Sequence, residues 1–347
     1  MKTYLVYVQL GQNPAPILYD SARQALDCKN LETFLITDKP FLHNLFPGKV
    51  IEYHRSHNRR ALKSFNRRYP DKRSMAGGYW LNTLERIFAL NVLKNHVEYD
   101  AQIIHTESDV YSYLNEEILV TLNEMNINVA MPRFSPERGI GSFVYFRNFG
   151  FLEGSLDSFQ KILDREPIEN DMELFGFALN SGLIQELPSN PEHCPKISER
   201  IHLIFDGAAL GQYLFGQDPF HQNGDYVSGF INPFSTIQYE KAKWGVHEIN
   251  GKKFVSFTYG GSKFVIVNLH LHSKEIIPEI DAENLIWTRV FNEANGISPR
   301  SVRTSGVTSV HAERPLIRTR IQTIRRLGLG NTLVLTARKL LRIIRSS

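Results

Sequence analysis

Cysteine and long apolar runs are both scarce in this sequence of 347 residues. Two cysteines, Cys28 and Cys194, are too few for a disulfide framework or a cysteine-rich zinc site, and the count is typical of a reducing compartment. No apolar run approaches the ~20 residues that span a bilayer. Residues 3–10 look like a strand and lack the longer apolar stretch and small-residue cleavage site of a secretory signal. These absences predict a cytoplasmic protein.

Charge is divided unevenly along the chain. Residues 298–347 contain eleven Lys and Arg and one acidic residue, a net charge of +10, which leaves −6 for the preceding part of a chain whose total is +4. We therefore predict a separate basic, helical tail over residues 296–347. On a helical wheel, Arg338, Arg342 and Arg345 lie opposite an apolar side. Such a helix fits either peripheral contact with the anionic inner face of a membrane or docking on the acidic body.

The body of the chain alternates between short apolar runs and segments with helical periodicity. This alternation predicts an α/β fold with a mainly parallel central sheet of the Rossmann type and helices on both faces. Gly260-Gly261 predicts a tight hairpin turn. The expected strands are residues 3–10, 33–37, 49–53, 101–105, 128–131, 141–146, 255–259 and 263–272, and the expected helices are residues 21–28, 80–93, 114–124, 155–164 and 171–184.

Two carboxylates follow the apolar run 101–105, in Glu107-x-Asp109. If this segment is extended, both side chains point the same way from the end of a buried strand. Ligands of open parallel sheets bind at the carboxyl ends of strands, and two oxygen ligands there suit Mg²⁺ or Mn²⁺ held together with a diphosphate. The alternative interpretation is a pair of solvated loop acids.

A second group of candidate ligands lies in the run from Phe264 to Lys274. Strand alternation separates an apolar face from a face that carries Asn268, His270, His272 and Lys274. A histidine could complete a Mn²⁺ shell, and Lys274 could neutralise diphosphate oxygens. The alternative is a surface strand whose outward face is polar.

Three further acids are candidates for a catalytic carboxylate, each with a structural alternative. Asp206 begins a run of small residues that predicts a closely packed helix, where an acid is often an N-cap. Asp171 and Glu173 lie at a predicted helix N-terminus, which favours acids electrostatically without any catalytic role.

A basic run extends from Arg55 to Arg73, and Asp71 is its only acid. A solvated loop is the simplest interpretation. Contact with an anionic donor or acceptor is the functional one, because arginine binds phosphate well.

Taken in chain order, these pieces resemble the GT-A glycosyltransferases, and more closely a little-characterised bacterial and viral group with that fold. The resemblance covers roughly residues 1–290 and leaves the tail outside. Its recurrent motifs are His105-Thr-Glu-Ser-Asp-Val110, Ile140-Gly-Ser-Phe143, Asn170-Asp-Met-Glu-Leu174, Phe205-Asp-Gly-Ala-Ala-Leu-Gly-Gln-Tyr213, Gly229-Phe-Ile-Asn232 and Asn268-Leu-His-Leu-His-Ser-Lys274.

The resemblance implies transfer of a sugar from a nucleotide-sugar donor, most simply a UDP- or GDP-sugar, to a glycan or lipid-linked acceptor. It implies a catalytic domain over residues 1–295, with a nucleotide-sugar half (1–130) and an acceptor half (131–295). Mn²⁺ or Mg²⁺ would assist departure of the diphosphate. The implied metal ligands are Asp109, His270 and His272, and the implied nucleotide-sugar contacts are Asp38, Arg86, Glu107 and Lys274.

Glu107 departs from the Asp that is commoner at the first acid of the motif, which favours Asp109 as the direct ligand. In an inverting reaction, Asp171, Glu173 or Asp206 would deprotonate the acceptor hydroxyl. A retaining reaction needs no such base on the attacking side.

Two other function classes compete with glycosyl transfer. A metal-dependent phosphoester or diphosphate hydrolase would use similar ligands and would release phosphate without a sugar acceptor. A nucleic-acid-binding protein would use the basic segments. The acidic body argues against the second, and no nucleic-acid partner is expected.

Overall fold

The computed structural model describes residues 1–11, 14, 17–54, 59–70, 79–194, 196–198, 201–215, 232 and 234–271. His272, Lys274 and the basic tail predicted over residues 296–347 lie outside these ranges. Within them, no helix is long and apolar enough to cross a membrane.

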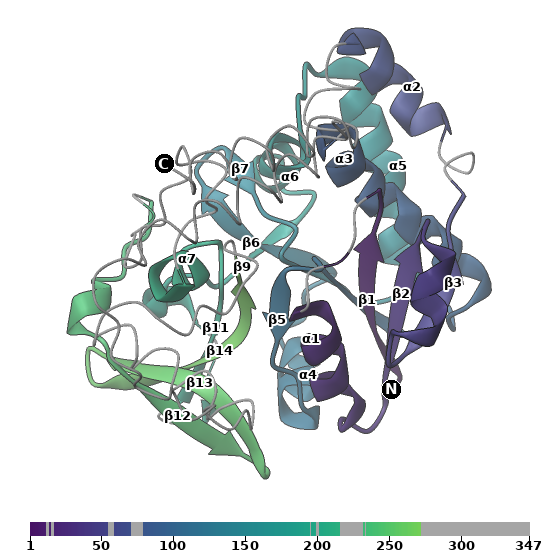
Figure 1. The fold of residues 1–347 in the computed structure, drawn as a ribbon. Coiled ribbons are helices and arrows are strands. Elements are labelled where there is room, and N and C mark those ends of the chain that lie inside the picture. Colours follow the sequence, from purple (N-terminus) through teal and green to yellow (C-terminus); the bar gives the residue numbers. More distant parts are fainter. Residues whose placement is uncertain are drawn as a thin grey trace, which may run out of the picture.

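The larger sheet has eight strands in the order β3-β2-β1-β4-β8-β6-β7, and β9 pairs with β6 outside this path (Figure 1). Strands β1 to β4 are mutually parallel neighbours, β8 is antiparallel to both β4 and β6, and β9 is parallel to β6. The predicted α/β fold with a mainly parallel central sheet is confirmed. The strands are β1 (Thr3–Gln9), β2 (Leu31–Thr37), β3 (Lys49–Glu52), β4 (Gln102–Thr106), β6 (Val129–Ser135), β7 (Arg138–Gly139), β8 (Phe143–Phe146) and β9 (Gln185–Leu187).

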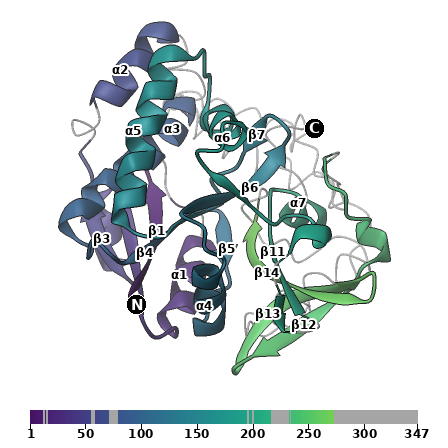
Figure 2. The same ribbon diagram turned by 180° about the vertical axis from the view of Figure 1, so that it is seen from behind.

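Helices cover both faces of this sheet, as Figures 1 and 2 show from opposite sides. Along β1, Tyr4, Val6 and Val8 belong to one apolar core and Leu5 and Tyr7 to the other, because successive side chains point to opposite faces. The first core contains α3 (Tyr79–Ala89), α5 (Phe149–Arg165) and α6 (Asp171–Asn180), and the second contains α1 (Ile17–Leu26) and α4 (Glu116–Glu124).

A second sheet of six strands packs against the core that contains α1 and α4. The strand β5 pairs with β14, so the chain passes from the large sheet into the small one directly after β4. The two sheets therefore meet at residues 107–112. The elements are β5 (Val110–Ser112), β10 (Lys196–Ser198), β11 (Ile201–Phe205), the helix α7 (Leu210–Phe215), β12 (Lys243–Ile249), β13 (Lys252–Tyr259) and β14 (Ser262–His270).

The predicted hairpin is present between β13 and β14. Gly260 and Gly261 both have positive φ, 58° and 83°, as a two-residue turn of this kind requires. The alternative of an exposed polar face on β14 is wrong for Asn268 and His270, which are 0% and 6% exposed. The strand lies inside its sheet, between β11 on one side and β13 and β5 on the other.

Several element boundaries differ from the sequence predictions. The interpretation of the basic run as a loop is wrong for α2 (Arg59–Arg68), which is helical and packs on α5. Helix α5 begins at Phe149, six residues before Ser155, because the side chain of Asn148 caps it by accepting from the Phe151 N–H at 3.1 Å. Helix α6 ends at Asn180 rather than at residue 184.

Candidate functional site

The candidate site lies where the parallel strands end. Gly11, Asp38 and Glu107 follow β1, β2 and β4, so they share one edge of the large sheet. The expected extended backbone at residues 107–109 is wrong. The N–H of Val110 donates to the carbonyl of Glu107 at 3.2 Å, and this closes a turn. The turn nevertheless brings the carboxylates of Glu107 and Asp109 to the same place.

Glu107, Asp109 and His270 form one cluster. The Nε2 atom of His270 lies 3.4 Å from Oδ1 of Asp109 and 3.6 Å from Oε2 of Glu107. The candidate ligand atoms of all three residues lie within 4.8 Å of one another. The side chains are 16% exposed or less. Two carboxylate oxygens and an imidazole nitrogen at this spacing could hold a divalent cation.

Electrostatics in the cluster favour a cation. Burial by itself lowers the pKa of His270, but the charge and hydrogen bond of Asp109, together with the charge of Glu107, raise it above its ordinary value. The two carboxylates thus stabilise positive charge at the position of the imidazole. A divalent ion bound to the neutral imidazole would supply positive charge to the same two carboxylates.

Arg86 joins this cluster to α6. Its Nη2 atom lies 2.9 Å from Oε1 of Glu107 and 3.8 Å from Oδ2 of Asp171. Glu107 therefore contacts Arg86 through one oxygen and His270 through the other. Burial raises the pKa of Asp171 to about 6, although the charge of Arg86 opposes the change. Arg86 and Asp171 reach the site from α3 and from the first turn of α6.

Asp206 is fully buried and binds main-chain groups. Its Oδ1 accepts from the N–H groups of Ala209 and Leu210 at 2.8 and 2.9 Å, and its Oδ2 accepts from those of Gly211 and His270 at 2.8 and 2.9 Å. Burial raises the pKa of this carboxyl group, and the N–H groups of His270, Gly211 and Ala209 act in the opposite direction, as does the charge of His270. Asp206 thus adjoins the cluster through the backbone of His270.

Glu173 and Asp38 lie outside the cluster. Glu173 takes part in the cap of α6: Asn170 Oδ1 accepts from its N–H at 3.0 Å, and Glu173 Oε2 accepts at 2.9 Å from the N–H of Glu169, the residue before the N-cap. The carboxylate of Asp38 accepts from the Gly11 N–H, with oxygens at 3.0 and 3.2 Å.

Three residues near the cluster were not among the metal, donor or catalytic residues predicted from the sequence. Burial is the chief cause that raises the pKa of the half-buried Tyr79, and the charges of Arg86, Asp171, Glu107 and Asp109 also act on its phenol. Ser142 and Asn268 lie within the motifs quoted above and form hydrogen bonds around Asp206. Motif membership was the only signal for Ser142, whereas Asn268 also lay on the polar face of the predicted strand with His270, and nothing in the sequence pointed to Tyr79.

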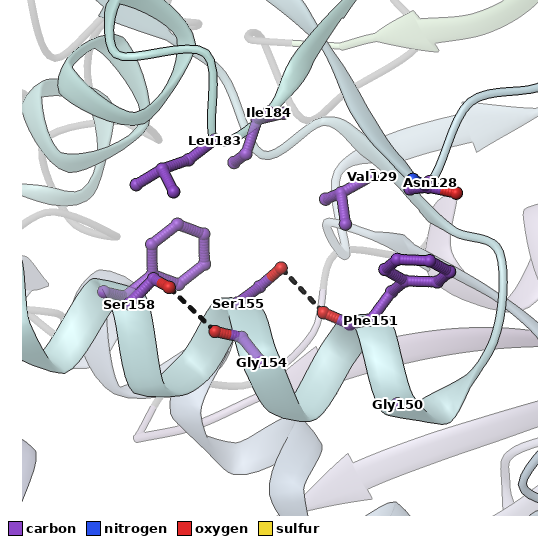
Figure 3. Close-up of a pocket in the computed structure, with 10 residues that line it drawn as sticks. Asn128, Val129, Gly150, Phe151, Gly154, Ser155, Ser158, Leu183 and Ile184 are labelled. Atoms are coloured by element: carbon purple, nitrogen blue, oxygen red, sulfur yellow. Dashed lines mark hydrogen bonds between the residues drawn. The ribbon is translucent and has the colours of Figure 1, made fainter.

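A separate hollow of about 230 Å³ lies beside α5 and is lined by ten residues, among them Val129, Gly154 and Leu183 (Figure 3). The hydrogen bonds drawn as dashed lines in Figure 3 join Ser155 and Ser158 to carbonyl groups of their own helix. None of the lining residues is charged or belongs to the cluster. The hollow is therefore distinct from the candidate metal site.

No protein-family model and no curated protein matches this chain. Solved structures match about half of it, among them glycosyltransferases. The glycosyltransferase GlyE of Streptococcus pneumoniae TIGR4 is 13% identical to this chain, with a TM-score of 0.33. The match covers 54% of this chain and 45% of the GlyE chain. Mouse xyloside xylosyltransferase 1 is 13% identical with a TM-score of 0.31, over 54% and 86%. Core-mannan synthase A of Aspergillus fumigatus, in an Mn/GDP form, is 10% identical with a TM-score of 0.35, and the match covers 54% of this chain and 72% of the synthase chain.

The chain thus spans less than half the length of GlyE. At these identities and TM-scores the likenesses carry no argument about function, which has to come from the side chains of the site.

Proposed function

We propose that this chain is a metal-dependent glycosyltransferase that moves a sugar from a nucleotide-sugar donor to a glycan or lipid-linked acceptor. The observation that carries the proposal is the cluster of Glu107, Asp109 and His270 at the carboxyl edge of the parallel strands, with the guanidinium of Arg86 beside it. This edge is where open α/β sheets bind ligands. A cation and an arginine there suit a diphosphate group.

The ligand set fits Mn²⁺, since carboxylates suit hard cations and imidazole suits the softer transition metals, and Mg²⁺ would use the carboxylates. Asp109 and His270 would hold the ion, which supplies positive charge against the departing diphosphate. His272 is proposed as an additional ligand, and Lys274 as a second cation on the diphosphate. Glu107 holds Arg86 and His270 in place through its two oxygens.

Arg86 and Asp38 are proposed to contact the donor from the nucleotide-sugar half, residues 1–130. The ion pairs of Arg86 with Glu107 and Asp171 support this role, since they hold its guanidinium beside the cluster. Asp38 follows β2 at the same sheet edge, where its carboxylate is held by the Gly11 N–H.

Asp171 is our candidate for a carboxylate that takes a proton from the acceptor. It lies beside Arg86, and its pKa of about 6 is closer to neutrality than that of an ordinary aspartate. Glu173 belongs to a helix cap and Asp206 binds four main-chain N–H groups, so both carboxylates already have structural partners.

Hydrolysis of a phosphoester or diphosphate remains the second candidate, because the same ligands could activate water. The two reactions differ in their products. A transferase releases nucleoside diphosphate in proportion to glycosylated acceptor, whereas a hydrolase releases phosphate or nucleotide without one.

The proposal is tested by titrating the purified chain with UDP- and GDP-sugars, with and without Mn²⁺, and following the midpoint of thermal unfolding. We expect one nucleotide to raise the midpoint only when Mn²⁺ is present. Asp109→Asn should abolish the shift, and Asp157→Asn, an exposed acid on α5, should retain it. A Mn²⁺-independent shift, or the same shift in Asp109→Asn, would contradict the metal site. Product analysis then separates transfer from hydrolysis.

A further inference from the structure

Asp206 and His270 lie 64 residues apart in the sequence and are brought together by two neighbouring strands. β11 ends at Phe205 and runs parallel to β14. Their register shifts at this point, since Ile204 pairs with Ile266 but Phe205 pairs with Asn268. Such a bulge interrupts the ladder and re-aims the residues that follow. The main-chain N–H of His270 then donates to Asp206 Oδ2 rather than to a strand carbonyl.

The opposite edge of β14 is also fixed. The Leu271 N–H donates to the carbonyl of Asp109 at 2.9 Å, and His270 pairs with Val110 of β5. The backbone at residue 270 is thus held between Asp206 on one side and the segment that carries Asp109 on the other. The contact with Asp206 is made by a side chain, so substitution of Asp206 can remove it.

A small polar network supports Asp206. The Asp206 N–H donates to Asn268 Oδ1 at 3.1 Å, and the hydroxyl of Ser142 donates to the Asp206 carbonyl at 3.1 Å. The hydroxyl of Thr106, the residue before Glu107, donates to the Ser142 carbonyl at 2.8 Å. These hydrogen bonds therefore link the end of β4, beside Glu107, through Ser142 and Asp206 to β14, which carries His270.

We propose that Asp206 is a positioning residue that fixes the main chain of His270, and so aims the imidazole at Glu107 and Asp109. This inference rests on the proposed metal site. It gives Asp206 a role other than that of a catalytic base, because both carboxylate oxygens already accept two N–H groups each. Partners of a metal ligand that act in this way typically contribute about tenfold to a hundredfold in metal affinity.

Substitution can separate the two tasks of Asp206. Asparagine presents one oxygen and one NH₂ group, so two of the four main-chain donors lose their acceptor in either side-chain orientation. Serine presents a single hydroxyl oxygen, which can accept from an N–H of the turn that leads into α7, and it lacks the second oxygen that accepts from His270. Asn148→Ala is the matched control, since it removes the cap of α5 without any contact to the cluster.

The experiment measures the dissociation constant of Mn²⁺ by calorimetry for the full chain, with circular dichroism as a check on folding. Asp206→Asn and Asp206→Ser should both weaken Mn²⁺ binding by about tenfold or more. Asn148→Ala should lower the unfolding midpoint and bind Mn²⁺ as the unsubstituted chain does. Faster hydrogen exchange at the His270 amide in the two Asp206 variants should accompany the weaker binding.

Two results would overturn the proposal in distinguishable ways. If the unsubstituted chain binds Mn²⁺, Asp109→Asn does not, and folded Asp206→Ser binds it with unchanged affinity, then only the positioning role is wrong. If the unsubstituted chain binds no Mn²⁺, the metal site of the proposed function is wrong and the positioning role is wrong with it.

Discussion

The backbone of Gly211 lies directly against the carbonyl group of His270. A Cβ atom at position 211 would lie 2.1 Å from that carbonyl oxygen, well inside contact distance. Helix α7 can approach β14 this closely only with glycine at this position, and the approach places the Gly211 N–H on the carboxylate of Asp206. A small residue in α7 thus helps to determine where a candidate metal ligand lies.

Gly211→Ala should therefore destabilise the protein by about 1–3 kcal/mol, the usual cost of overpacking, and weaken Mn²⁺ binding. The control is Gly154→Ala on α5, where an added Cβ meets nothing within 4 Å. That change should raise the free energy of unfolding by up to ~1 kcal/mol, because alanine favours helix. Denaturant unfolding of both variants checks this. Equal stability of the two would contradict the close packing.

Removal of Arg86 should leave the carboxylates of Glu107 and Asp171 without their shared cation. Arg86→Met is expected to lower the free energy of unfolding by about 3–5 kcal/mol, as for other broken buried ion pairs. Lys94→Met removes an exposed partner of Glu153 and should cost less than about 1 kcal/mol. Denaturant titration of both variants at low salt measures the difference. Losses of similar size would show that the Arg86 pairs behave as surface pairs.

His105 should make the protein less stable in mild acid. The ring is buried, its Nδ1 lies 3.1 Å from the Val6 carbonyl oxygen, and burial lowers its pKa to about 4 from 6.5. Between these values the unfolded chain binds the proton more readily than the folded one, so stability falls as pH falls from about 6.5 to about 4. The full effect of this residue is about 3 kcal/mol.

The measurement compares the unsubstituted chain with His105→Gln by denaturant unfolding across that pH range, with a chelator present. As pH falls, the free energy of unfolding of His105→Gln should rise relative to that of the unsubstituted chain. The pH effects of all other groups are common to both proteins and cancel in the difference. A difference that does not change with pH would contradict a buried neutral ring.

Neither cysteine should react readily in the folded protein. Burial raises the pKa of Cys28 and raises that of Cys194 to about 12, so both remain thiols at about pH 8 and thiols are poor nucleophiles. Alkylation by iodoacetamide, followed by mass spectrometry, should be slow in buffer and fast in guanidinium. Rapid labelling of the folded chain would contradict the burial of Cys28 and the partial burial of Cys194.

Much of the fold could be predicted from local sequence. The apolar runs at residues 3–10 and 33–37 became β1 and β2 because strands buried on both faces need little beyond β-forming apolar residues. Gly260-Gly261 specified its turn, since both residues need positive φ. Boundaries set by side-chain caps were harder to predict. The start of α5 depends on Asn148, whose residue type is equally common in loops.

In the candidate site too, some features could be predicted from local sequence and others depended on tertiary structure. The sequence by itself determined that Glu107, Asp109 and His270 carry groups able to bind a cation, and that the first two follow a buried strand, because these are properties of residue type and local pattern. Tertiary structure decided that His270 lies beside them, that Arg86 and Asp171 arrive from α3 and α6, and that Asp206 bonds to the backbone of His270. These contacts join residues up to 163 positions apart. Pairing of β5 and β11 with β14 creates the contacts of His270, and packing of α3 and α6 on the large sheet brings Arg86 and Asp171 to the site. Both depend on the packing of the whole chain.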